Sequence, residues 1–143
     1  SRYYLGGYKT SSSSGMTNQF YTYERGTNRY DTSRPLYWDG MVGLMYPSDY
    51  GYAAGNTCVT GTDPFNYDGG CMNKDWLYIS NTYQWLISSR SDNNIVVFIV
   101  HSSGFVGNDG SNHVFLVRPT FYLKADTNIK SGDGSSTNPY ILS

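Results

Sequence analysis

Short apolar and aromatic runs alternate along the chain with stretches of Gly, Asn, Ser and Asp. Runs of β-branched and aromatic residues bounded in this way are typical of short strands. We therefore predict strands at residues 3–5, 41–46, 76–79, 83–87, 95–101, 104–106, 113–117, 120–124 and 139–142. Two hairpin-type turns, at 108–110 (NDG) and 132–134 (GDG), separate the last of them, because Asp-Gly pairs tolerate a positive φ.

Two segments have helical signals. Residues 17–25 offer Thr17 as an N-cap and Gly26 as a C-terminal stop, and Ser48 with Asp49 can begin a brief helical turn through Ala54. Residues 11–15 and 55–75 have little periodicity and are predicted to be loops. The chain is thus expected to be a single α+β domain spanning 1–143, with short antiparallel strands, one or two short helices and much loop.

Aromatic side chains supply the core that the aliphatic residues cannot. Only 38% of the 143 residues are hydrophobic, but they include 15 Tyr, 6 Phe and 3 Trp, each of which buries a large area. The large residues that we expect to be buried are Trp38, Met45, Trp76, Trp85, Phe98 and Tyr122. We expect Arg118 to bond to backbone carbonyls or an Asp, because a buried guanidinium needs partners.

Cys58 and Cys71 are the only cysteines, and with two histidines they fit no zinc pattern. The chain is rich in Ser, Gly, Asn and Tyr, which favours one disulfide between the two cysteines and therefore an oxidising compartment. The alternative is two buried thiols. No apolar run is long enough to span a membrane, so an export signal or anchor is expected upstream of Ser1. Ten basic and eleven acidic residues argue against nucleic acid as a partner.

The chain lacks the usual patterns of catalytic residues. His101 and His113 are the only histidines, Glu24 is the only glutamate, and neither Gly-x-Ser-x-Gly nor His-Glu-x-x-His occurs. Hard oxygen ligands for calcium are present at Asp63, Asp68 and residues 108–112, but the same residue types also form turns. We therefore predict a protein that is not an enzyme and has no metal or cofactor.

The most informative segment surrounds the strand at 95–101. Alternation gives this strand two apolar faces, one with Val96, Phe98 and Val100 and the other with Ile95, Val97, Ile99 and His101. Aromatic anchors among Ser, Gly and Asn are typical of recognition surfaces, and the alternative is an ordinary hydrophobic strand with polar loops. The ligand-binding residues that we predict are Arg90, Asp92, Asn93, Asn94, Ile99, His101, Phe105, Asn108, Asp109, Asn112, His113 and Phe115.

Six motifs resemble one family across nearly the whole chain. They are residues 4–7 (YLGG), 23–26 (YERG), 38–53 (WDGMVGLMYPSDYGYA), 117–123 (VRPTFYL), 132–134 (GDG) and 138–140 (NPY). Together they resemble the C-terminal globular domain of type IV pilin-like surface proteins of Gram-positive gut bacteria. The N-terminal pilin-like helix of that family is absent from these residues.

A second resemblance is to the variable proteins of diversity-generating retroelements, which have a C-type-lectin-like fold. The mixture of residues at 90–115, beside a frame of Trp85, Gly104 and residues 117–119, is similar to their randomised segment. The resemblance implies a hypervariable binding surface at 88–115. It also implies that the terminal strands pair, residues 3–5 against 140–142.

These observations favour a secreted or cell-surface recognition domain. Its expected ligand is a protein or glycan on a host, a phage or a neighbouring cell. The alternative is a structural pilin subunit domain whose partners are other pilin subunits and whose 90–115 segment packs against them. A carbohydrate-active enzyme is the third and least favoured possibility.

Overall fold

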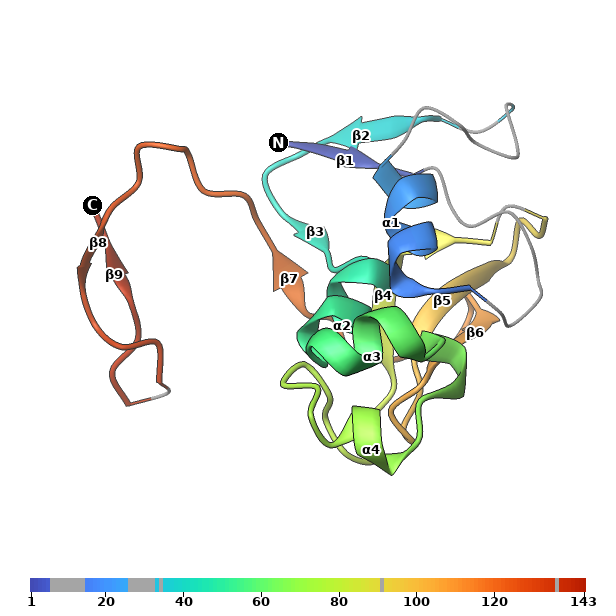
Figure 1. Ribbon diagram of the computed structural model, residues 1–143. Helices are drawn as coiled ribbons and strands as arrows, with labels where there is room; N and C mark the ends of the chain where they lie inside the picture. Colours follow the sequence, from blue (N-terminus) through green and yellow to red (C-terminus); the bar gives the residue numbers. More distant parts are fainter. Residues whose placement is uncertain (6–14, 26–32, 34, 91, 136) are drawn as a thin grey trace.

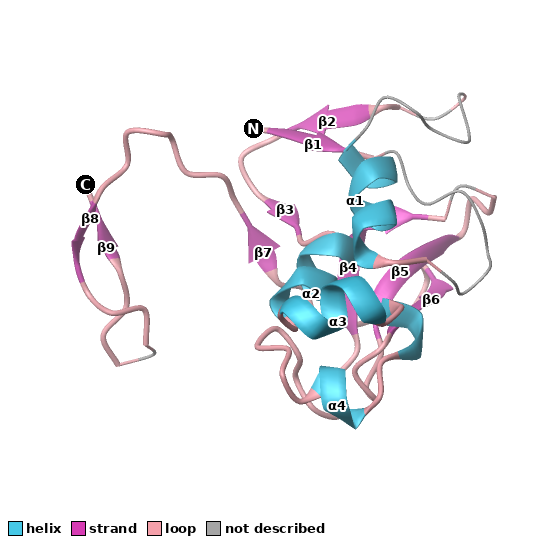
Figure 2. Cartoon of the chain, viewed as in Figure 1, coloured by secondary structure: helices cyan, strands magenta, loops and turns pink. Residues whose placement is uncertain are grey.

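A three-stranded antiparallel sheet lies at the centre of the molecule, with helices packed on one of its faces (Figure 1). Its strands lie in the order β4 (Gln84–Ser89), β5 (Val96–Val100) and β6 (Val106–Gly110). The helices over it are α1 (Thr17–Arg25), α2 (Pro47–Ala53) and α3 (Asn56–Gly61). Helices, short antiparallel strands and long connections together confirm the predicted α+β class (Figure 2).

The computed structural model describes residues 1–5, 15–25, 33, 35–90, 92–135 and 137–143. The predicted loop at 11–14 and the expected stop signals Gly6, Gly7 and Gly26 lie outside these residues. Within the described part, three two-stranded ladders accompany the central sheet. They are β1 (Arg2–Tyr4) with β2 (Tyr37–Asp39), β3 (Gly43–Leu44) with β7 (Pro119–Thr120), and β8 (Ile129–Ser131) with β9 (Ile141–Leu142).

The two ends of the chain do not pair, so the predicted ladder between residues 3–5 and 140–142 is wrong. Strand β1 instead pairs with β2, where Tyr3 lies opposite Trp38 and Arg2 donates two 3.0 Å hydrogen bonds to Asp39. Strand β9 folds back on β8 through the glycine turn that the sequence predicts, with a φ of 95° at Gly132. Each terminal strand therefore has a partner much closer along the chain than the other terminus.

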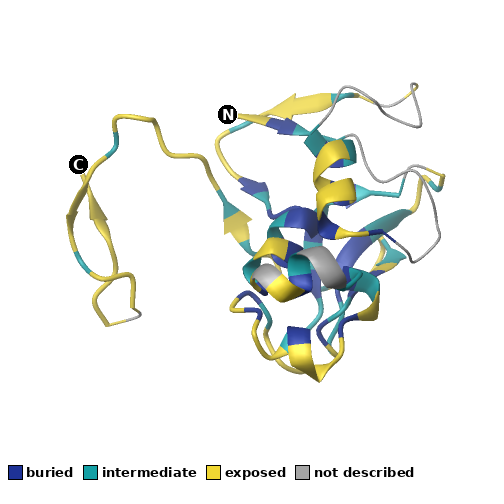
Figure 3. Ribbon diagram, viewed as in Figure 1, coloured by how far each residue is buried: buried dark blue, intermediate teal, exposed yellow. Residues whose placement is uncertain are grey.

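The C-terminal hairpin of β8 and β9 projects away from the rest of the molecule (Figures 1 and 3). An extended segment joins the hairpin to β7. The apolar side chains of the hairpin are exposed. They are Ile129, Tyr140, Ile141 and Leu142. A two-stranded hairpin is only marginally stable by itself, so this element lacks the packing that stabilises the other strands.

Both predicted helices form. The first occupies the predicted residues, although Thr17 is its first helical residue and is buried instead of serving as the cap. Phe20 and Glu24, one turn apart, are both fully buried. Helix α2 begins with Pro47, and the Asp49 carboxylate accepts a 2.9 Å hydrogen bond from the Tyr46 backbone N–H.

The prediction of a loop throughout 55–75 is wrong, because α3, a 3₁₀ turn η1 (Pro64–Asn66) and α4 (Gly69–Met72) lie there. Asp63 caps η1 by accepting from the Phe65 N–H, and Asp68 caps α4 by accepting from the Gly70 N–H, both at 2.9 Å. These carboxylates therefore act as caps, the role typical of Asp in turns. Elements this short do not repeat the helical period, so hydrophobic spacing cannot reveal them.

The predicted disulfide is confirmed, and Cys58 of α3 is bonded to Cys71 of α4. Both cysteines belong to the core between the helices and the sheet, whose other buried members are Phe20, Met45, Tyr50, Ala54, Tyr67, Leu77, Leu86, Phe98, Val100 and Val106. The hydroxyl groups of the two tyrosines in this core have hydrogen-bond partners. Tyr50 Oη donates to the Gly104 carbonyl at 2.6 Å, and Tyr67 Oη donates to the Gly51 carbonyl at 3.0 Å.

Burial is as predicted for Met45 and Phe98, each 1% exposed, whereas Trp85 is only half-buried. The prediction is wrong for three residues, since Trp38, Trp76 and Tyr122 are 48%, 74% and 54% exposed. Helices α1 to α4 supply Phe, Tyr and Cys side chains to the core. The space that the large residues were expected to fill is thus already occupied.

Several strand boundaries also differ from prediction. Residues 76–79 form no strand, 41–46 contributes only β3, and 113–117 makes only a parallel bridge from Leu116 to Gln84. Residues 108–110 lie inside β6 and do not turn, because Asn108 and Gly110 pair with Phe98 and Val96 of β5. The chain turns earlier, between His101 and Phe105.

Candidate functional site

The face of the central sheet opposite the helical layer has a cluster of six rings, which we call the aromatic surface. Its members are Tyr83, Trp85, His101, Phe105, His113 and Phe115. Phe105 stacks on His101 with centroids 4.3 Å apart, and His101 meets Tyr83 edge-on at 4.7 Å. Phe115 stacks on Tyr83 at 5.0 Å, contacts Trp85 at 4.8 Å and meets His113 edge-on at 5.6 Å. The rings form one continuous chain of contacts.

Strand alternation places these rings on one side. Trp85 lies opposite Ile99, which lies opposite Gly107 in the neighbouring strand. Directly opposed residues share a face, so Tyr83, Trp85, Ile99 and His101 point away from the core that holds Phe98 and Val100. Ile99 is only 1% exposed, which places it beneath the surface. The prediction that Ile99 contacts a ligand is therefore wrong, and Ile99 is a buried support for the rings.

His101 is held in one orientation by hydrogen bonds at both ring nitrogens. Its Nδ1 accepts from the Ser103 backbone N–H at 3.1 Å, so in the neutral imidazole the proton is on Nε2. That nitrogen then donates to Tyr83 Oη, 3.2 Å away. The turn from His101 to Phe105 is closed by a backbone hydrogen bond, in which the His101 N–H donates to the Phe105 carbonyl at 2.8 Å.

Gly104 is required in this turn. Its φ is +82°, and a side chain there would collide with Met72. A residue with a Cβ would be strained and would also have to displace Met72 from the core side. The turn that presents Phe105 therefore depends on a glycine at position 104.

The segment carrying His113 and Phe115 is attached to the edge of β4. The Leu116 N–H donates to the Tyr83 carbonyl at 3.0 Å, and the Trp85 N–H donates to the Leu116 carbonyl at 2.8 Å. At its other end His113 Nδ1 lies 3.1 Å from Asp109 Oδ1. These contacts hold Phe115 over Tyr83 and Trp85 while leaving His113 exposed.

A groove of about 490 Å³ runs beside the rings between residues 81–83 and 114–116. Val114, which is 96% exposed, and Leu116 line it with Tyr83 and Phe115. Sequence reasoning did not identify Tyr83, Trp85, Val114 or Leu116 as site residues. Tyr83 and Trp85 lie in a predicted strand, but only the pairing of β4 with β5 shows that they share the face of Ile99 and His101.

The polar residues of the predicted site separate into two groups. Asp109 joins the aromatic surface through His113. Arg90 instead donates to both carboxylate oxygens of Asp92 at 2.9 Å and to Asn108 Oδ1 at 3.3 Å. Asn108 is paired with Phe98 and so faces the core side of the sheet. Arg90, Asp92 and Asn108 therefore form a separate polar cluster, in which Arg90 after β4 reaches Asn108 in the middle of β6.

The other asparagines of the predicted site either bond to the nearby backbone or are exposed to solvent. Asn93 Oδ1 accepts from the Ile95 N–H at 2.9 Å, which shapes the connection between β4 and β5. Asn94 and Asn112 are exposed. Of the twelve predicted residues, the structure gathers His101, Phe105, Asp109, His113 and Phe115 on the aromatic surface.

Comparisons with known proteins give no relative: no family model, no curated protein and no solved structure matches the chain. Among the residues that the structure describes, no helix has the length and apolar character needed to cross a membrane. Within the same residues, no group of three or more His, Cys, Asp or Glu side chains is arranged to hold a metal ion.

Proposed function

We propose that this chain is a ligand-binding, adhesin-like domain displayed at a cell surface, and that the aromatic surface is its binding site. The observation that carries the proposal is the continuous contact of six rings on one sheet face, over a buried Ile99. Five of these side chains are half-buried and His113 is exposed, so the rings present edges and faces to solvent. No covalent chemistry is involved.

Rigid aromatic residues suit this role because they bury much area at a small cost in conformational entropy. Here Ser103, Tyr83 and Gly104 fix His101 and the turn to Phe105 before any ligand arrives. Ordering these side chains on binding should therefore cost little. Exposed Val114 and Leu116 extend the apolar contact, and Asp109 with His113 supplies polar groups beside it.

The location and ligand class rest on two further observations. A disulfide indicates an oxidising compartment, which supports export to the cell surface. The resemblance to type IV pilin-like surface proteins and to retroelement variable proteins supports attachment to a protein or glycan on a host, a phage or a neighbouring cell. His101, Phe105, Asp109, His113 and Phe115 all fall within the 88–115 segment that the second resemblance implies to be variable.

A structural pilin subunit is the second candidate, and the C-terminal hairpin is the observation that favours it. Its apolar residues are exposed, as are Phe121, Tyr122 and Leu123 before it. Exposed apolar segments of this extent are typical of contacts with other subunits. In that role the hairpin would carry the function and the aromatic surface would not.

Replacing three of the ring residues and Val114 by serine should weaken binding strongly. We expect a variant with Phe105→Ser, His113→Ser, Val114→Ser and Phe115→Ser to lose roughly 30-fold or more in affinity, because central aromatic anchors dominate binding energies. Binding is measured to whole cells and to protein and glycan arrays, and folding by circular dichroism. The milder pair His113→Ser and Val114→Ser changes only exposed residues and should show part of the loss.

The matched control is a hairpin variant with Tyr140→Ser and Ile141→Ser, which removes a similar exposed apolar area elsewhere. It should bind like the wild type. Unchanged binding by the folded ring variant would reject the site. Loss of binding in the hairpin variant alone would favour the subunit role.

A further inference from the structure

A second hollow, of about 410 Å³, lies between helix α2 and residues 76–77. We call it the Trp76 pocket, and the residues that matter for its chemistry are Met45, Asp49, Tyr52, Trp76, Arg118 and Thr120. It shares no residue with the aromatic surface. Its volume lies within the range of small-molecule sites, roughly 300–1,000 Å³.

The pocket has an exposed aromatic wall. Trp76 is 74% exposed, and its turn is fixed because the Leu77 N–H donates to Asp75 Oδ1 at 3.0 Å. Since Asp75 and Leu77 on either side are both buried, Trp76 is held outward. Tyr52, which is 45% exposed, also lines the hollow and is braced edge-on by Tyr21. A large ring that is held away from the core in this way is available for stacking on a ligand.

Two oppositely charged groups stand beside these rings. Arg118 is bonded as the sequence predicts, with Nη2 donating to the Leu77 carbonyl at 3.2 Å and Nε to Gln84 Oε1 at 3.3 Å. Because a guanidinium has five N–H donors, Arg118 retains donor capacity toward the pocket.

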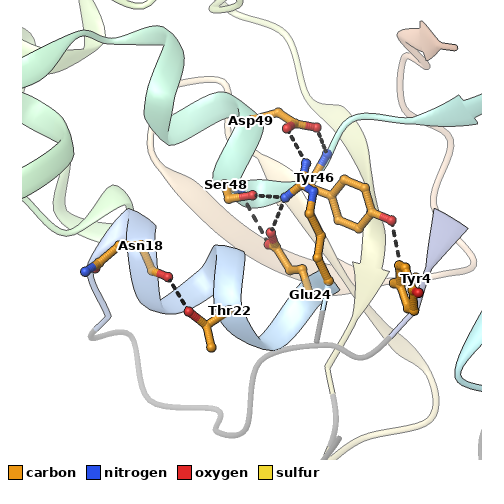
Figure 4. A network of polar contacts seen from close by, with 8 residues as sticks. Tyr4, Asn18, Thr22, Glu24, Tyr46, Ser48 and Asp49 are labelled. Atoms are coloured by element: carbon orange, nitrogen blue, oxygen red, sulfur yellow. Dashed lines mark hydrogen bonds and ion pairs between the residues drawn. The ribbon is translucent and has the colours of Figure 1, made fainter. Parts of the chain in front are cut away.

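Asp49 is fixed from the opposite wall. One carboxylate oxygen accepts from the Tyr46 N–H and the other pairs with Arg25, while 39% of the side chain stays exposed (Figure 4). Each oxygen has a second lone pair, so Asp49 can accept from a ligand without losing these bonds. Both charged groups are therefore positioned before any ligand binds.

The charges restrict which ligand fits. A ligand with only a negative charge can pair with Arg118 but lies near Asp49, and one with only a positive charge can pair with Asp49 but lies near Arg118, so each also meets a like charge. A purely aliphatic ligand would desolvate both charged groups without compensation. A neutral molecule with an apolar ring face and several hydroxyls suits both the exposed rings and the two charged groups, which then act as its hydrogen-bond partners.

We propose that the Trp76 pocket binds a neutral pyranose ring of a glycan. The C–H face of the sugar stacks on Trp76 and Tyr52, its hydroxyls donate to Asp49, and Arg118 donates to its oxygens. This site is separate from the aromatic surface and does not depend on the function proposed for it. The chain would then contact a glycan and a second ligand through two different surfaces.

The test uses the whole chain with the methyl pyranosides of glucose, galactose, mannose and N-acetylglucosamine, by saturation-transfer NMR and by titration of Trp fluorescence. We expect at least one pyranoside to bind with a millimolar Kd and Trp76→Ala to weaken it at least tenfold. Trp76→Phe, which keeps a ring, should retain part of the affinity. The substitution lies at an exposed position, so the fold should be preserved.

The control is the His113→Ser and Val114→Ser pair, which should bind the pyranoside as the wild type does. This separates failure of the Trp76 pocket from failure of the aromatic surface. The proposal is overturned if none of the four pyranosides binds the wild type, if Trp76→Ala binds as tightly as the wild type, or if inorganic phosphate binds the pocket in their place.

Discussion

Removal of the Cys58–Cys71 disulfide is expected to lower the free energy of unfolding by about 3 kcal/mol. The bond closes a loop with a sequence separation of 13 and joins α3 to α4 inside the core. Without it, the unfolded chain gains conformational freedom, and α3 and α4 lose the covalent cross-link between them. For a chain of this size the change corresponds to a fall in Tm of roughly 10 °C. Thermal unfolding of the wild type with and without reductant measures it.

A Cys58→Ala and Cys71→Ala variant is the control, because it should unfold at the same lowered Tm in both buffers. Mass measurement before and after alkylation checks the bond itself. Two alkylatable thiols in the native wild type, or a Tm that reductant leaves unchanged, would contradict the prediction.

The stability of the fold should decrease as the pH rises from about 5 to about 8, because of Glu24. This residue is fully buried in the network between α1 and α2, where it lies near Arg25, Ser48 and Asp49 (Figure 4). Burial raises the pKa of Glu24 from 4.5 to about 8, although the Ser48 hydrogen bonds and Arg25 oppose the change. Arg25 also donates to Ser48 Oγ and pairs with Asp49. Its positive charge is therefore divided between two carboxylates and only partly stabilises the ionised form of Glu24.

The sign of the effect follows from which state keeps the proton. Below pH 4.5 the carboxyl is protonated in both the folded and unfolded chain, and the full stability is present. As the pH rises, the unfolded chain loses a proton that the folded chain retains until about pH 8. The free energy of unfolding then falls, on the order of 4 kcal/mol over the whole range. Burial also raises the pKa of Asp75, to about 7, which adds to the trend in the same direction.

Guanidinium unfolding at several pH values from 5 to 9 measures this dependence. Glu24→Gln cannot ionise and should flatten most of the curve, while Asp75 accounts for the remaining slope. Asp126→Asn, at an exposed position, is the matched control and should leave the curve unchanged. An identical pH dependence in Glu24→Gln and the wild type would show that Glu24 does not keep its proton in the fold.

Features with a local physical cause could be predicted from the sequence. Helix α1 was expected from the end signals Thr17 and Gly26, β5 from its β-branched run, and the hairpin of β8 and β9 from the glycines at 132 and 134. The disulfide could be predicted because no other cysteine competes for either partner. Each of the first three features depends on residues that are close together in the sequence. The disulfide depends on the presence of only two cysteines.

Strand partners could not be predicted in the same way. The terminal strands were expected to pair with one another, but β1 joins β2 and β9 joins β8. The Asn108–Gly110 pattern indicated a turn, yet β5 supplies partners for these residues throughout β6. Both errors have one cause, since a backbone hydrogen bond depends on which strand arrives beside it and not on the residues that form the strand.

The sequence by itself determined the α+β class, the helices at 17–25 and 47–53, the disulfide, and the concentration of aromatic and polar residues around β5. Only the tertiary structure decided which of them form a surface. Pairing of β4 with β5 brings Tyr83 and Trp85 beside His101 and buries Ile99 beneath them. The tertiary structure also leaves Trp76 exposed to solvent, because the helices fill the core with their own side chains. Hydrophobicity indicates which residues favour burial, but the volume available between packed elements decides which of them are buried.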